Sequence, residues 1–196
     1  MTTVAITGGI GAGKSEALKA FERHGAAVSS SDQTVHRLFG EDAEVRAALR
    51  DRFGEEIFDA DGELDRPRLG RIVFADRDQL TWLEELLHPR VVREDLAWRE
   101  RLLLEPRPPT LIVTEVPLLY ETGGERRFDK VVAVTAPEMV RAARTKVRAD
   151  GRSARLLPDA EKIRRADFAF VNDGSLEALD QFVIGVIRTI GQDPSG

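Results

Sequence analysis

Residues 8–15 read Gly-Gly-Ile-Gly-Ala-Gly-Lys-Ser and satisfy the phosphate-loop pattern, in which a glycine and four further residues precede Gly-Lys-Ser. A short apolar, β-branched run over 3–6 precedes the loop, and apolar residues at helical spacing follow it over 16–21. In a strand, glycine loop and helix of this kind, backbone N–H groups and the helix N-terminus hold phosphate oxygens. This order of elements predicts an α/β fold with a parallel sheet, because phosphate loops lie at the carboxyl ends of parallel strands.

The loop also supplies most of the predicted nucleotide contacts. Lys14 would reach the β- and γ-phosphates, and the Ser15 hydroxyl would ligate Mg²⁺. Glycines are needed because a Cβ would block close approach of the backbone or forbid a positive φ. We therefore expect bound ATP and Mg²⁺, with nucleotide contacts from Gly9, Gly11, Ala12, Gly13, Lys14, Ser15 and Glu16.

Composition excludes several classes of protein. The 196 residues include no cysteine, which rules out disulfides and thiolate chemistry and fits a cytoplasmic protein. A net charge of −5 argues against a nucleic-acid surface, and no apolar run reaches membrane-spanning length. The chain opens directly into the first predicted strand, so we expect no signal peptide. A small-molecule substrate is therefore expected, with no nucleic acid and no membrane, and the oligomeric state is left open.

The order of apolar patterns predicts two parts. Predicted strands lie at 3–6, 26–29, 110–115, 130–134 and 168–171. Between the second and third strands the pattern is helical apart from a turn-rich connection over 54–64, and a helix break is expected at His88-Pro89 because proline cannot donate a helical hydrogen bond. We expect a three-layer nucleotide-binding core over 1–33 and 106–196, with a helical substrate-binding insertion over 34–105.

Two acids lie at or just after the ends of predicted strands, at the sheet edge that carries the loop. Asp32 follows the second strand, where it would either accept a proton from an attacking hydroxyl or simply cap the next helix. Glu115 ends the third strand, and an acid at that position beside a phosphate loop is typical of the magnesium site. Both interpretations of Asp32 stay open at this point.

A basic run follows the fourth predicted strand. It consists of Arg141, Arg144, Lys146, Arg148, Arg152 and Arg155. Such a run is usually a solvated helix face, but arginines that close over a triphosphate stabilise the charge that develops in phosphoryl transfer. We expect a short lid over 144–158 and a phosphate contact from at least one of these residues.

Taken in order, these motifs resemble the dephospho-CoA kinase family over nearly the whole chain. The most specific stretches are Thr-Gly-Gly-Ile-Gly at 7–11, Leu-His-Pro at 87–89 and Pro-Leu-Leu-Tyr-Glu at 117–121. Further matches are Asp32, the Leu-Asp-Arg at 64–66, Ala166-Asp167, and Asn172 with Gly174-Ser175. The resemblance implies a P-loop NTPase fold with a five-stranded parallel sheet, a helical substrate domain and an arginine-bearing lid.

The resemblance also implies an activity, namely transfer of the γ-phosphate of ATP to the ribose 3′-hydroxyl of dephospho-CoA, which completes coenzyme A. By position it makes Asp32 the candidate base, and it puts Asn172 and Gly174 near the adenine of ATP. The expected catalytic residues are Asp32, Lys14 and Arg148. The expected substrate contacts are Asp32, Arg66, His88 and Leu118, and the expected metal ligands are Ser15 and Glu115.

The chain departs from the family pattern at three places. Ser30-Ser31-Asp32 stands where the family usually has Asp-Ala-Asp, and the lid is several residues short. Glu16 replaces the usual Ser or Thr; an acid suits the first turn of a helix but would repel a nearby triphosphate. The alternatives are another small P-loop kinase that acts on a nucleoside or nucleotide, and a catalytically impaired nucleotide-binding switch.

Overall fold

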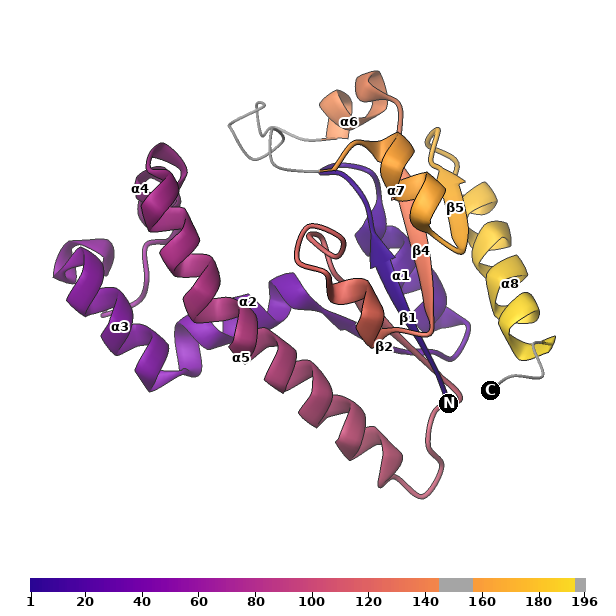
Figure 1. Cartoon of the computed structure of the whole chain (residues 1–196), viewed down its shortest axis with the longest axis horizontal. Coiled ribbons are helices and arrows are strands. Elements are labelled where there is room, and N and C mark those ends of the chain that lie inside the picture. Colours follow the sequence, from indigo (N-terminus) through magenta and orange to yellow (C-terminus); the bar gives the residue numbers. More distant parts are fainter. Residues whose placement is uncertain (145–156, 193–196) are drawn as a thin grey trace. The chain divides into compact units, whose positions relative to one another are not determined.

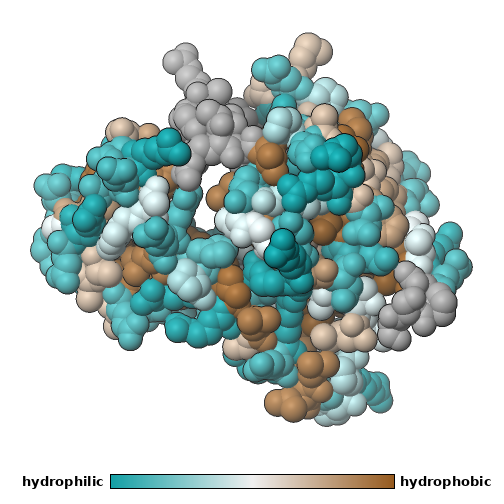
Figure 2. Space-filling view, in the orientation of Figure 1, coloured by the Kyte–Doolittle hydropathy of each residue, from teal (hydrophilic) through white to brown (hydrophobic). Residues whose placement is uncertain are grey.

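The computed structural model describes residues 1–144 and 157–192. The chain forms two compact units, of which the first comprises Met1–Ser30 and Arg99–Gly196 and the second comprises Ser31–Trp98. Hydrophilic side chains dominate the surface seen in Figure 2, where apolar side chains lie in small groups. Among the described residues, no helix combines the length and apolar character that crossing a membrane requires.

The first unit contains a five-stranded parallel sheet in the order β2-β3-β1-β4-β5 (Figure 1), which confirms the predicted fold class. The strands are β1 (Thr2–Thr7), β2 (Ala27–Ser30), β3 (Leu111–Glu115), β4 (Lys130–Thr135) and β5 (Phe168–Val171). In the sheet register Glu115 lies opposite Ile6 of β1 and Ser30 of β2. The carboxyl ends of the three strands are therefore level, and Glu115 lies beside the start of the phosphate loop.

Helices cover the sheet because its strands are apolar on both faces. The helices among the described residues of this unit are α1 (Lys14–Arg23), α6 (Glu138–Arg144), α7 (Asp159–Arg165), α8 (Leu176–Gln192) and the short η2 (Gly124–Arg127). Val4 and Ile6 pack with α1 and α8 on one face, whereas Ala5 packs with Leu119 and Leu157 on the other. Alternate residues of one strand thus build the two cores.

The second unit is a small helical core. Its elements are α2 (Ser31–Glu41), α3 (Ala43–Phe53), η1 (Glu55–Ile57), α4 (Arg66–Ala75) and most of α5 (Arg77–Leu103). Buried Val45, Leu49 and Ile57 pack with residues of α4 and α5. Asp65 caps α4 by accepting a hydrogen bond from the N–H of Arg68 at 2.9 Å, and Pro67 lies in the first turn of the helix.

The predicted break at His88-Pro89 is wrong, because α5 is one helix with Pro89 inside it. A proline inside a helix costs about 3 kcal/mol through one lost hydrogen bond and a ring clash. Burial of Leu83 and Leu87, on the turns just before it, offsets that cost. The guanidinium of Arg90 also donates to the carbonyl oxygen of Leu86 at 2.9 Å, next to the carbonyl that Pro89 leaves without its helical donor.

Candidate active site

The phosphate loop joins β1 to α1, and its backbone needs glycine at two positions. Gly8 has a φ of 151°, and a Cβ there would overlap the carbonyl oxygen of Val134 in β4. Gly13 has a φ of 99°, and a Cβ there would overlap the side-chain amide of Asn172. Glycine at these two positions lets the loop lie against β4 and against Asn172, and the backbone N–H groups of such a loop can hold an anion.

Lys14 folds back over the loop that precedes it. Its Nζ donates to the carbonyl oxygen of Gly9 at 3.1 Å and lies 3.9 Å from Oε1 of Glu115. The two side chains are only 11% and 6% exposed, so the pair is shielded from water. A shielded ammonium at this position is ready to bind a phosphate oxygen.

Ser15 and Glu115 form an oxygen-donor pair that fits a magnesium ion. The Ser15 hydroxyl donates to Oε2 of Glu115 at 3.4 Å, and Glu115 is the buried last residue of β3. Mg²⁺ prefers oxygen ligands and is commonly held by one or two carboxylates together with substrate phosphates. In the described part of the chain, no group of three or more His, Cys, Asp or Glu forms a closed metal cage. The donor set therefore fits a metal that a nucleotide helps to hold.

Asn172 connects the end of β5 to the loop. It is 3% exposed, and its Nδ2 donates to the carbonyl oxygen of Ala12 at 2.9 Å. Its Oδ1 accepts from the N–H of Gly174 at 3.1 Å and from Nη2 of Arg144 at 3.2 Å. Arg144 also donates to the carbonyl oxygen of Gly11 at 3.5 Å. Asn172, which the family resemblance puts near the adenine of ATP, is thus held against the phosphate loop.

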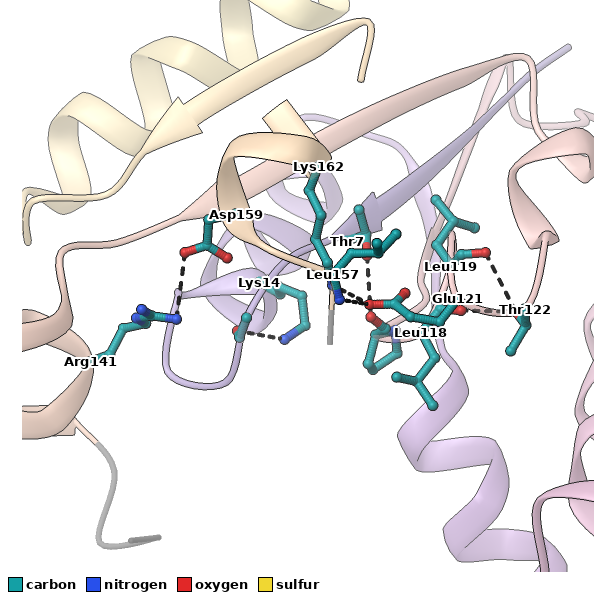
Figure 3. Close-up of polar contacts among 12 residues, drawn as sticks. Thr7, Lys14, Leu118, Leu119, Glu121, Thr122, Arg141, Leu157, Asp159 and Lys162 are labelled. Carbon is teal, nitrogen blue, oxygen red and sulfur yellow. Dashed lines mark hydrogen bonds and ion pairs between the residues drawn. The ribbon is translucent and has the colours of Figure 1, made fainter. Parts of the chain in front are cut away.

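A second contact with the phosphate loop, beside Gly9, is an ion pair between Arg141 and Asp159. The sequence indicated only the arginine. Nη1 of Arg141 is 3.5 Å from Oδ2 of Asp159, the first residue of α7. Figure 3 shows this pair beside the loop that carries Lys14. Asp159 was missed because an acid in the first turn of a helix is ordinary, and only the tertiary fold places it near Gly9.

A second ion pair is buried, and the sequence did not predict it either. Lys162 of α7 has no exposed side-chain surface, and its Nζ lies 3.0 Å from Oε1 of Glu121. The N–H of Leu157 donates to the same oxygen at 2.8 Å (Figure 3). The sequence signal was weak, because Lys162 belongs to a short, highly charged helix whose lysine would ordinarily be solvated.

The other predicted site residues are distributed as follows. Asp32 is exposed and lies within the first turn of α2, which begins at Ser31, so Asp32 does not precede the helix as a cap. Arg66 is the exposed first residue of α4, and His88 is exposed on α5; all three belong to the second unit. Leu118 follows β3 in the first unit. Arg148 and most of the predicted lid lie outside the described residues.

Known proteins resemble the chain over almost its full length. The family model described as Dephospho-CoA kinase matches residues 2–178. The dephospho-CoA kinase of Frankia casuarinae is 38% identical over 186 residues, which are 92% of this chain and 80% of that protein. The solved structure of the dephospho-CoA kinase from Campylobacter jejuni is 25% identical, with a TM-score of 0.68 over 96% of each chain. Shikimate kinase from Aquifex aeolicus, 11% identical with a TM-score of 0.54 over 97% of this chain and 98% of its own, shares the fold alone.

These matches bear directly on the resemblance drawn from the motifs. The family model begins in β1 and ends in α8, so it includes the phosphate loop, the helical unit and the Asn172 turn. The relatives favour dephospho-CoA kinase over the other small P-loop kinases that the phosphate loop alone would allow. The chain is an ATP-using kinase, and it belongs to the dephospho-CoA kinase family.

Proposed function

We propose that this chain transfers the γ-phosphate of ATP to the ribose 3′-hydroxyl of dephospho-CoA, giving coenzyme A and ADP. The observation that carries the proposal is the contact of Lys14 and Ser15 with buried Glu115, in a chain whose match to the family spans residues 2–178. Phosphoryl transfer depends mainly on positioning and on electrostatic stabilisation, and this site offers both.

The donor half of the site is the phosphate loop. Lys14 would exchange the carbonyl oxygen of Gly9 for the β- and γ-phosphates. Ser15 and Glu115 would hold Mg²⁺ against the same phosphates. When bound, the ion neutralises charge on the β- and γ-phosphate oxygens. Asn172 and Gly174 would lie at the adenine end, where Arg144 already contacts Asn172.

Asp32 would serve the acceptor half as the general base. Ser30 lies opposite Glu115 in the sheet register, and Asp32 follows it by two residues along the chain. In the proposed step the ribose oxygen bonds to the γ-phosphorus while the bond to the β–γ bridging oxygen breaks. ADP leaves, and Asp32 takes the proton of the hydroxyl. Arg66, His88 and Leu118 are the proposed substrate contacts.

Glu16 is the departure that bears most directly on the donor site. Its Oε1 pairs with Nζ of Lys19 at 2.8 Å, one turn along α1. Both side chains are about half exposed, at 45% for Glu16 and 61% for Lys19, so solvent and the lysine together screen the carboxylate. We propose that this local pairing lets the chain tolerate an acid directly after Ser15.

The composition supports a location and a partner class. We propose a cytoplasmic enzyme without nucleic-acid partners, on the basis of a cysteine-free chain with a net charge of −5. The small-molecule substrate is then the partner that the protein recognises.

The activity test measures ADP release and coenzyme A formation with ATP, Mg²⁺ and dephospho-CoA, with adenosine as the comparison acceptor. Folded wild-type protein that makes no coenzyme A would contradict the proposal.

Asp32→Asn should lower kcat by about 10²–10⁴ and leave the Kd for ATP unchanged, because general base catalysis contributes that much. Glu41→Gln, which removes another exposed acid of the same helix α2, is the matched control and should keep wild-type turnover. Full turnover by Asp32→Asn would show that Asp32 is not the base.

A further inference from the structure

Arg141 and Asp159 place opposite charges against the same glycine of the phosphate loop. A Cβ added to Gly9 would lie 2.8 Å from Nη1 of Arg141 and 3.4 Å from Oδ1 of Asp159. Arg141 comes from α6 and Asp159 from α7, and their side chains meet at 3.5 Å (Figure 3). An arginine and a carboxylate therefore share the space directly beside Gly9.

Gly9 marks the end of the loop where the β- and γ-phosphates would lie. In phosphate loops the lysine at this position binds those two phosphates. Here that residue is Lys14, which donates to the carbonyl oxygen of Gly9 at 3.1 Å. The other arginine of α6, Arg144, instead contacts Gly11 and Asn172. Of these two arginines, Arg141 is thus the one at the end where phosphoryl transfer takes place.

The two charges act on an incoming phosphate in opposite ways. The planar guanidinium of Arg141 matches phosphate oxygens and attracts them, whereas the carboxylate of Asp159 repels them. The side chains are 33% and 28% exposed, and a distance of 3.5 Å is long for an ion pair. A pair of this kind is weak and can exchange partners at low cost.

We propose that Asp159 is an internal competitor of ATP: it holds Arg141 over Gly9 in the free protein and releases it to the β- or γ-phosphate of bound ATP. The inference rests on the proposed function as far as the loop binds a nucleoside triphosphate. Arg141 is then a phosphate ligand, and Asp159 is a residue that lowers ATP affinity while it positions that ligand.

The test measures the Kd for ATP by titration calorimetry in the presence of Mg²⁺ and without acceptor. Arg141→Gln should raise the Kd about 10- to 100-fold, because it removes charge-assisted hydrogen bonds to phosphate. Asp159→Asn should lower the Kd about 2- to 5-fold, because it removes the competing anion. Arg141→Lys, which keeps the charge but loses the planar fork, should fall between wild type and Arg141→Gln.

Two controls separate this competition from a general charge effect. Glu161→Gln removes an acid of the same helix whose partner is Arg164, and it should change the Kd less than about 2-fold. AMP lacks the β- and γ-phosphates, so neither Arg141→Gln nor Asp159→Asn should shift its Kd. The gain from Asp159→Asn should shrink at high salt, where charge interactions at exposed groups are screened.

The inference is supported if Arg141→Gln raises the Kd for ATP and Asp159→Asn lowers it. An ion pair with a purely structural role would instead weaken ATP binding whichever partner was removed. Weaker ATP binding by Asp159→Asn, unchanged binding by Arg141→Gln, or equal shifts for AMP would each overturn it. The outcome is separate from that of the activity test. If the wild type makes no coenzyme A but the two shifts keep their signs, the proposed acceptor is wrong and the competition stands.

Discussion

Lys162→Met should destabilise the first unit strongly, because it leaves a carboxylate buried without its counter-ion. Lys162 has no exposed side-chain surface and Glu121 is 12% exposed, so neither charge is solvated. After the substitution Glu121 keeps the N–H of Leu157, a single neutral donor at 2.8 Å. Removing one partner of a buried ion pair costs about 3–5 kcal/mol, which corresponds to a fall in Tm of about 6–20 °C for a chain of this size.

The assay follows thermal unfolding by far-ultraviolet circular dichroism, with tryptophan fluorescence recorded in parallel. Trp82 and Trp98 both belong to the second unit, so their fluorescence reports that unit. The dichroism reports the helices of both units, so the part of its change that does not coincide with the fluorescence change belongs to the first unit, and the Tm of that part should fall by the full amount. The fluorescence transition should fall less, since Lys162 and Glu121 both lie in the first unit.

Two further variants make the result decisive. Arg164→Met, two residues along α7, breaks an ion pair whose arginine is 73% exposed, and its Tm should match that of the wild type. The double variant Lys162→Met with Glu121→Leu should be more stable than Lys162→Met alone, because replacing both buried charges by apolar groups removes the uncompensated carboxylate. A Lys162→Met protein with wild-type Tm would refute the reasoning, and so would a double variant as unstable as the single one.

Two other predictions concern pH and the metal. Hydrogen bonds from Arg23, and then from His24, hold the pKa of Asp180 below its ordinary value of 3.8. A carboxyl whose pKa is lowered by folding stabilises the fold above its unfolded pKa and loses that contribution as the pH falls through the folded value. Asp180→Asn should therefore have a slightly lower Tm than the wild type at pH 7, and this difference should disappear at pH values below the lowered pKa; a difference that persists there would contradict the assignment. Glu115→Gln should raise the Mg²⁺ concentration needed for half-maximal turnover about 10- to 100-fold, and an unchanged magnesium requirement would remove Glu115 from the metal site.

Patterns within a single strand or helix turn were sufficient to predict the elements whose formation depends on residues close together in the sequence. The run Leu-Ile-Val-Thr-Glu at 111–115 is apolar and β-branched, and it forms the fully buried strand β3. The Asp65 cap follows from a side-chain hydrogen bond within the next turn. Pro89 shows the limit of such reasoning, because burial of its neighbours on α5 outweighs a local rule that ends most helices.

Contacts between distant residues could not be predicted in the same way. The motif at 117–121 includes Glu121, but nothing in the sequence pairs it with a lysine 41 residues later. Likewise, the basic run predicted that some arginine would meet phosphate without distinguishing Arg141 from Arg144. Of these two described arginines, the fold sets Arg141 beside Gly9 together with Asp159, whereas Arg144 contacts Gly11 and Asn172.

The two ion pairs of α7 differ in burial, and this difference assigns them different roles. Asp159 and Lys162 lie one turn apart on the same seven-residue helix. The Lys162–Glu121 pair is buried, so water cannot solvate its charges once they are apart, and separating them would cost several kcal/mol. The Asp159 pair is about a third exposed, so solvent or a phosphate can replace either partner at a cost of about 1 kcal/mol or less. The buried pair can therefore hold α7 in place while Arg141 leaves Asp159 for the nucleotide. This exchange of partners requires no movement of α7 itself.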